Sequence, residues 1–187
     1  KKIQNLYSGG RVRPVIKNSH VAISEKLSGR VLDAQMQPID NLGPLEQDST
    51  KSASKLGNDY SLTPLERKGV IEPLDVGIRA INSLFSVGKG QRLGLFAGSG
   101  VGKSKLLGMM TRFTSADVVI VSLVGERGWE VKDFIEQSLG KEGLKKAIVI
   151  ASPADDSPLL RIKAAELSHQ LAAYFRDKNS NVLLLIL

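Results

Sequence analysis

The segment 93–104 constrains the fold more than any other part of the chain. A short apolar run at 93–96 leads directly into a glycine-rich loop that ends in a lysine and a serine. The spacing of the loop is that of a P-loop, although Ala97 stands where the pattern usually begins with Gly. We therefore expect a buried strand at 93–96, then the loop, and then a helix over about 102–113.

The residues of this loop suit the phosphates of ATP and a bound Mg²⁺. Glycines let successive backbone N–H groups turn toward phosphate oxygens, and the helix that follows adds its dipole. Lys103 would contact the β- and γ-phosphates, and the Ser104 hydroxyl would bind Mg²⁺. The expected nucleotide-binding residues are Gly98, Ser99, Gly100, Val101, Gly102, Lys103 and Ser104. The alternative is a glycine-rich turn that binds nothing, which the strand and helix patterns on either side disfavour.

The second half of the chain alternates between apolar runs and amphipathic segments. Strands are expected at 118–124, 147–150 and 182–187. The helix after the first of these carries an apolar face, and a later helix is expected to begin at Ser157, with Pro158 in its first turn. Strands buried on both faces and alternating with helices predict an α/β fold, a parallel sheet with flanking helices.

The first part of the chain has a different character. Short runs rich in Val and Ile, broken by turns, predict part of a small N-terminal β-barrel at 1–48. A polar stretch predicts a linker at 49–70, which leaves 71–187 as an incomplete P-loop nucleotide-binding domain. Because the sequence ends within an apolar run, we expect a piece of a longer protein that is inactive by itself.

The composition excludes several classes of site. Cysteine is absent, so the chain has neither disulfides nor thiolate metal ligands, and no apolar run or leader predicts a membrane span or a signal peptide. The formal net charge is +7, but the basic residues are scattered and aromatic residues are few. A specific nucleic-acid groove is therefore not expected, and a solvated basic surface explains the charge more simply.

A second candidate site follows the expected strand at 118–124. The end of a parallel strand is where ligands lie in such sheets, and Glu126 and Arg127 occupy this position. Glu126 could orient or deprotonate the water that attacks the γ-phosphate, while Arg127 could stabilise charge on the phosphates. An ordinary surface turn with a Glu–Arg pair fits the residues equally well.

The chain resembles the rotary ATPases related to the F-type ATP synthase β-subunit, which share the RecA/F1-like P-loop fold. Within that group it is most similar to the flagellar type III export ATPases. The resemblance rests on the P-loop and on segments 73–77, 90–94, 107–110, 125–128, 131–134 and 153–161. Segments 9–12 and 29–33 resemble the N-terminal barrel of the same group.

The resemblance implies a homohexamer that hydrolyses ATP to energise flagellar protein export. It implies that Glu126 is the catalytic carboxylate, with Arg127 beside it at the γ-phosphate and Lys103 on the phosphates. It also implies a cytoplasmic protein at the cytoplasmic face of the inner-membrane export gate, compatible with peripheral membrane association. The implied partners are export-apparatus proteins and chaperone–cargo complexes, without specific nucleic acid.

Three alternatives remain open beside this interpretation. The injectisome ATPases of virulence-associated type III secretion are close relatives of the flagellar group. A nucleic-acid motor of the RecA or Rho type shares the same core. A non-catalytic nucleotide-binding subunit would typically carry Gln at the position of Glu126, which disfavours that alternative.

Three residues depart from the pattern of the group that the chain resembles. Lys105 stands where a small or apolar residue is usual, and Trp129 stands where Arg is usual. Leu187 occupies the position at which the Walker-B Asp is expected after the apolar run.

Overall fold

The computed structural model describes residues 25–45, 64–67, 69–98 and 100–187. A four-stranded sheet in the order β1-β3-β2-β4 forms its centre, and all of its strand pairs are parallel. The strands are β1 (Val31–Leu32), β2 (Val118–Val124), β3 (Ala147–Ser152) and β4 (Val182–Ile186). The predicted strands at 118–124, 147–150 and 182–187 are therefore confirmed.

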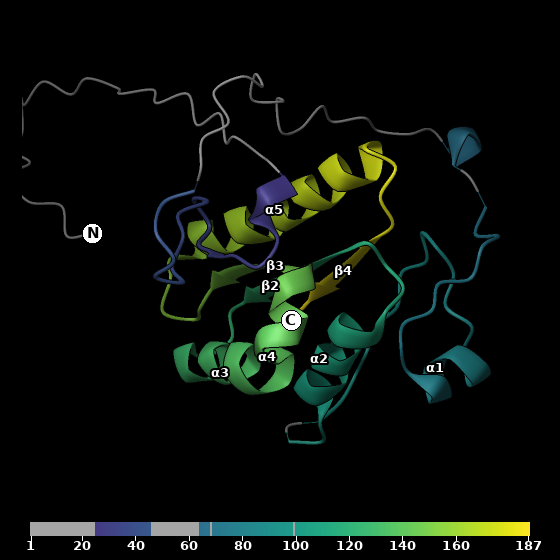
Figure 1. The fold of residues 1–187 in the computed structure, drawn as a ribbon, viewed down its shortest axis with the longest axis horizontal. Helices are drawn as coiled ribbons and strands as arrows, with labels where there is room; N and C mark the ends of the chain where they lie inside the picture. The colour runs from purple at the N-terminus through teal and green to yellow at the C-terminus, as the bar shows by residue number, and fades with distance from the viewer. Residues whose placement is uncertain (1–24, 46–63, 68, 99) are drawn as a thin grey trace, which may run out of the picture.

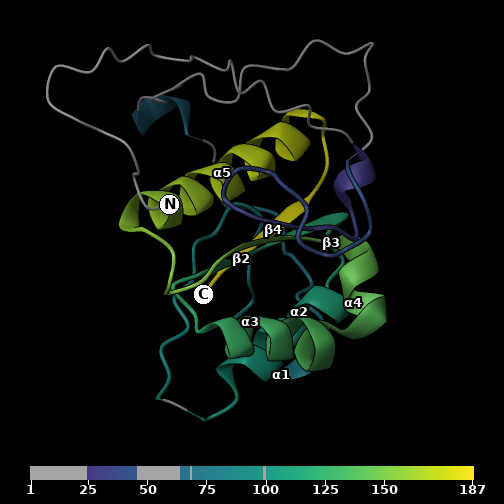
Figure 2. The same ribbon diagram turned by 90° about the vertical axis from the view of Figure 1, so that its left-hand side faces the viewer.

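Helices cover both faces of the sheet, as Figures 1 and 2 show. One face carries α5 (Pro158–Asp177), the longest helix, which connects β3 to β4. The other face carries four elements: α2 (Lys103–Phe113), α3 (Gly128–Asp133), the π-helix η3 (Phe134–Leu139) and α4 (Gly140–Lys146). The predicted α/β fold with flanking helices is confirmed.

The alternation of side chains along β2 explains why two separate cores form. Val119, Val121 and Leu123 are completely buried toward α2, α3 and η3. Ile120 points the other way and packs beneath α5. Continuous apolar strands of this kind are required when both faces of a sheet are covered by helices.

The start of α5 agrees with the helix start predicted at Ser157 and Pro158. The backbone N–H of Leu160 donates to Ser157 Oγ over 3.4 Å, so that Ser157 caps the helix, and Pro158 occupies its first position. Among the described helices, none combines the length and the apolarity needed to cross a bilayer.

Residues 93–96 do not form the predicted strand. They have no regular secondary structure and belong to none of the described strand pairs, and Leu93, Leu95 and Phe96 are exposed. An apolar run becomes a strand only where a neighbouring strand offers free N–H and C=O groups. The described residues provide no such neighbour at 93–96, so the P-loop follows an unpaired segment.

The first described residues join the main sheet. Val31 and Leu32, predicted as part of a barrel, pair instead with Val149 and Ile150 of β3. Residues 1–24 and 46–48 of the predicted barrel lie outside the described residues, as does most of the predicted linker. The division into 1–48, 49–70 and 71–187 as a whole stays a prediction.

A nearly buried ion pair holds the turn after β1. Arg30 Nε donates to Asp40 Oδ2 over 2.7 Å, and the backbone N–H of Val31 donates to the same oxygen over 3.0 Å. Burial by itself would raise the pKa of Asp40, but the hydrogen bonds from Arg30, Val31 and Leu42 outweigh it and lower that pKa to about 2.

A candidate nucleotide-binding site

The P-loop ends where α2 begins. Gly102 lies just before the first helical residue with a φ of 101°, and Gly100 has a φ of 77°. Both angles fall in the left-handed region that only glycine adopts without strain, which explains the glycines at these two positions. The predicted helix over 102–113 is confirmed as α2, and Ser99 lies outside the described residues.

The start of α2 is open to an anion. No side chain caps this helix, and its first main-chain hydrogen bond runs from Leu106 N to Gly102 O over 2.9 Å. The N–H groups of the first turn are therefore left for another acceptor, as at helix starts that bind phosphate. A side-chain carbon built on Gly98, Gly100 or Gly102 would meet no atom within 4 Å, so this face of the loop has room for a ligand.

The lysine and serine of the motif differ in their exposure. Lys103 is half-buried and Ser104 is exposed. Within the described ranges, no three His, Asp or Glu side chains gather to hold a metal ion. Magnesium is commonly held by few protein groups together with substrate phosphates. The Ser104 hydroxyl beside bound phosphates therefore fits Mg²⁺ in that mode.

The loop after β2 brings a glutamate to the same region. Gly125, with a φ of 81°, turns the chain away from the strand and leaves Glu126 half-buried. Two hydrogen bonds of 2.9 Å join this loop to the end of β3 and to the loop that follows it. Gly125 N donates to Ser152 O, and Ala154 N donates to Glu126 O. Main-chain hydrogen bonds to β3 and to the loop after it therefore hold the backbone of Glu126 in place.

Electrostatics connect Glu126 with the P-loop. Burial raises the pKa of the Glu126 carboxyl, and the neighbouring Glu130 carboxyl raises it further. The charge of Lys103 acts in the opposite direction and favours the ionised form of Glu126. Two site residues predicted from separate motifs thus interact electrostatically.

The Glu–Arg pair of the alternative interpretation, an ordinary surface turn, is not formed in the part of the chain that the structure describes. Arg127 is exposed and makes no salt bridge there with Glu126. Its backbone N–H instead donates to Glu130 Oε2 over 3.1 Å. This contact lowers the pKa of Glu130 below its ordinary value.

Glu130 was missed by the sequence reasoning, although a signal for it exists. It is the third residue of α3, and a Glu at that position commonly accepts from the N–H of the residue before the helix. The pattern would have placed the Glu130 carboxylate at the start of α3 and hence near Glu126.

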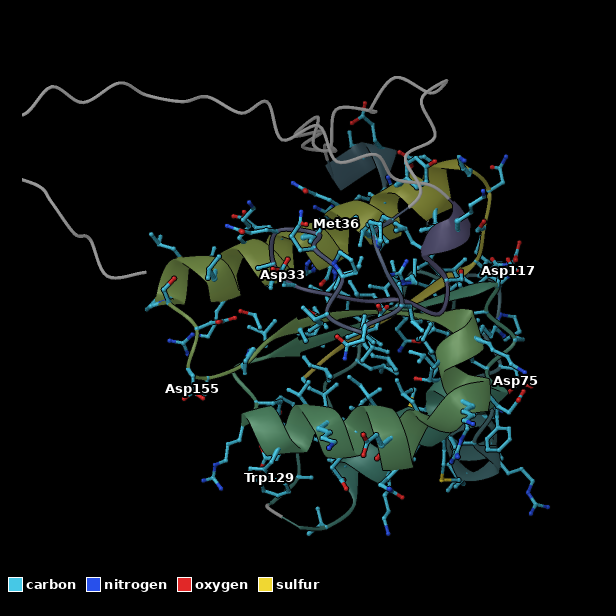
Figure 3. The ribbon with its side chains drawn as sticks, turned by 60° about the vertical axis from the view of Figure 1, so that its left-hand side comes forward. Asp33, Met36, Asp75, Asp117, Trp129 and Asp155 are labelled. Carbon is cyan, nitrogen blue, oxygen red and sulfur yellow. The ribbon has the colours of Figure 1, made fainter. Side chains whose placement is uncertain are left out.

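The three residues that depart from the expected pattern lie around this site. Figure 3 shows Trp129 at α3 with its side chain directed away from the sheet, and this side chain is 65% exposed. Lys105 is exposed on α2. Leu187 directly follows β4 and pairs with β2. Its N–H donates to Ser122 O over 2.9 Å, and its carbonyl accepts from Val124 N over 3.1 Å. An apolar residue therefore stands beside the end of β2.

A parallel α/β sheet with an open P-loop and a half-buried glutamate at the end of an inner strand defines a P-loop nucleotide-binding domain. Residues 77–187 match the model of the ATP synthase alpha/beta family, nucleotide-binding domain. The chain belongs to this family.

Curated relatives confirm the predicted resemblance to the flagellar group. The flagellum-specific ATP synthase of Pseudomonas aeruginosa is 52% identical over 178 residues, which cover 95% of this chain and 39% of the relative. That of Salmonella typhimurium is 45% identical over 195 residues, covering 100% of this chain and 41% of the relative. The chain thus spans about two fifths of the length of these relatives.

Solved structures agree with this assignment. A prototypical ATPase from the type III secretion system of pathogenic bacteria has a TM-score of 0.76 at 38% identity, covering 88% of this chain and 46% of that one. The assembled ATPase EscN of enteropathogenic E. coli, in complex with its central stalk EscO, has a TM-score of 0.79 at 38% identity. That match covers 88% of this chain and 40% of EscN.

Proposed function

We propose that the protein to which this chain belongs hydrolyses ATP and thereby energises flagellar type III protein export. The observation that carries the proposal is the P-loop at the start of α2, where no side chain caps the helix, together with the half-buried Glu126 that follows β2. The identity of 45–52% to flagellum-specific ATP synthases supports the flagellar assignment.

Different residues around the P-loop would bind the phosphates of ATP and the Mg²⁺ ion. The N–H groups of the loop and of the first turn of α2 would bind the phosphates, together with the ammonium group of Lys103. Ser104 would hold Mg²⁺, which neutralises phosphate charge when it is bound. Arg127, which is exposed, would approach the same phosphates.

Glu126 would act on the attacking water. The water oxygen forms a bond to the γ-phosphorus, the bond to the ADP oxygen breaks, and the water proton passes to Glu126. Burial raises the pKa of this carboxyl, which makes Glu126 a stronger base than an exposed glutamate.

The cellular setting is part of the same proposal. The protein would form a homohexamer and act with export-apparatus proteins and chaperone–cargo complexes at the cytoplasmic face of the inner membrane. The relative EscN was solved as an assembled ATPase with a central stalk protein, which supports assembly of this kind.

A virulence-associated type III secretion ATPase is the second candidate, because the solved relatives at 38% identity belong to that system. The higher identity to flagellar relatives favours the first candidate. Loss of flagellar filaments on deletion of the gene, with restoration by the wild-type gene, supports the flagellar role. A deletion strain that remains flagellated would favour the second candidate.

The test of nucleotide binding uses the full-length protein and Lys103→Ala. Loss of one charged contact should weaken Mg·ATP binding by about 1.5–3 kcal/mol, measured by calorimetry. Lys141→Ala is the matched control, because Lys141 is exposed on α4, and Gly143 of that helix lies against Arg112 in the last turn of α2, at the far end of this helix from the P-loop. Equal affinity in the Lys103 variant and the wild type would contradict the proposed site.

A further inference from the structure

Among the described residues, the half-buried Arg161 carries a buried side-chain nitrogen without a hydrogen-bond partner. Arg161 Nε is the one side-chain polar atom within the described residues that is buried without a hydrogen bond. None of the salt bridges in that part of the chain includes Arg161. A buried donor without an acceptor is costly, and more so when the group is charged. This arginine therefore requires an acceptor that the described residues do not supply.

The guanidinium group lies next to the glutamate loop. Arg161 is in the first turns of α5, and its Nη1 is 4.0 Å from the position that a side-chain carbon on Gly125 would occupy. Gly125 directly precedes Glu126, so Arg161 approaches the predicted catalytic loop from the α5 side of the sheet. The absence of a side chain at Gly125 leaves the space between them free.

The acidic residues nearby in sequence do not neutralise Arg161. Asp155 and Asp156 lie in the loop that leads into α5, where Figure 3 labels Asp155. Asp156 Oδ2 accepts from Ser152 Oγ over 2.8 Å, and neither aspartate forms a salt bridge with Arg161 among the described residues. Neither of these carboxylates is therefore the acceptor, which leaves Arg161 available to an anion from outside the described residues.

The location favours a phosphate as this anion. Ligands of parallel sheets lie beyond the carboxyl ends of the strands, which is where Gly125 and Arg161 meet. A planar guanidinium can donate two parallel hydrogen bonds to a phosphate, whereas an ammonium group acts as a point charge. Lys103 and Arg161 would then contact the same anion from two sides of the Glu126 loop.

We propose that Arg161 binds the terminal phosphate group of the nucleotide and retains the inorganic phosphate released from it. This inference rests on the proposed ATP hydrolysis and adds a residue from α5 to the site. Lys103 holds the phosphates of ATP and ADP alike, whereas Arg161 contacts only the group that is transferred to water.

The experiment measures product inhibition in the full-length protein. Inorganic phosphate and ADP are each tested as inhibitors of Mg·ATP hydrolysis in the wild type, Arg161→Gln and Arg161→Lys. Arg161→Gln should weaken inhibition by phosphate about 10–100-fold, the effect of one lost charged contact, and leave inhibition by ADP nearly unchanged. Arg161→Lys keeps the charge without the paired donors, so its inhibition by phosphate should lie between that of the wild type and that of Arg161→Gln.

Arg176→Gln is the matched control, because it makes the same substitution at the far end of α5, where Arg176 pairs only with its neighbour Asp177. If Arg161→Gln and Arg176→Gln respond alike to phosphate, the inference is overturned while the proposed hydrolysis stands. Equal losses of phosphate and ADP inhibition would assign Arg161 a structural role and overturn the inference as well.

A wild-type protein that does not hydrolyse Mg·ATP overturns the proposed function, and the inference with it. Should Arg161→Gln unfold, Arg161→Lys decides, because unchanged phosphate inhibition in that variant contradicts paired donation.

Discussion

Glu126 and Glu130 lie on either side of the start of α3, and their carboxyl groups meet different surroundings. Burial and the nearness of Glu130 both disfavour the charged form of Glu126, so its pKa is raised. Glu130 accepts from the N–H of Arg127, which favours its charged form and lowers its pKa. Two carboxyl groups whose pKa values are moved apart in this way are typical of acid–base sites.

This pair predicts a pH effect of Glu130→Gln in the full-length protein. The substitution removes a negative charge beside Glu126, so the pKa of Glu126 should fall while burial still holds it above its ordinary value. Glu126 must be ionised to accept a proton, so the acidic limb of the kcat profile should move to lower pH. Steady-state hydrolysis measured across pH checks the direction.

The control for this prediction is Glu136→Gln. Glu136 is exposed on η3 and pairs with Lys132 at 3.8 Å, away from Glu126. Its substitution should leave the acidic limb in place. A limb that stays fixed in Glu130→Gln, or moves to higher pH, would show that Glu130 does not act on the ionisation of Glu126.

At the level of secondary structure, close packing of α2 against η3 holds the P-loop helix on the sheet. Gly108 faces the π-helix, and a side-chain carbon there would lie 2.4 Å from the Ser138 carbonyl oxygen. The neighbouring Leu107 and Met110 are buried in the same core. Only glycine permits this approach, because the obstacle is backbone and cannot rotate away.

Gly108→Ala should therefore destabilise the chain, although alanine is the better helix former. The forced separation of α2 and η3 should lower the free energy of unfolding by about 1–3 kcal/mol, the usual cost of overpacking a core. Lys105→Ala, at an exposed position of the same helix, should change it by less than about 0.5 kcal/mol. Urea denaturation followed by circular dichroism compares them, and a gain of stability in Gly108→Ala would contradict the packing described.

The elements also explain where sequence reasoning succeeded and where it failed. β2 and β3 were predictable because strands buried on both faces require uninterrupted apolar residues, and α5 because Ser157 and Pro158 mark its start. The run at 93–96 carries the same signal but finds no partner among the described residues. A strand is a property of two segments, and one segment alone cannot reveal whether its neighbour is present.

For the molecule as a whole, the P-loop and the alternation of apolar runs with amphipathic segments indicated the class of fold, and the family model and relatives confirmed it. The sequence also placed Lys103 and Glu126 at the ends of separate elements, which a parallel sheet brings to one edge. Glu130 was predictable from its position at the start of α3, but no pattern indicated that Arg161 reaches Gly125 from the opposite face. That contact depends on how α5 crosses the sheet, which no local pattern specifies.

The most direct measurement compares kcat and Mg·ATP affinity in the full-length protein carrying Glu126→Gln. A carboxylate that activates water acts in the transition state and hardly in the ground state. We therefore expect kcat to fall by about 10²–10⁴ while the affinity for Mg·ATP stays nearly constant. Glu142→Gln, at an exposed residue of α4 paired with Lys145, should leave both quantities unchanged. A normal kcat in Glu126→Gln would contradict the proposed chemistry, and lost affinity with a normal kcat would make Glu126 a binding residue.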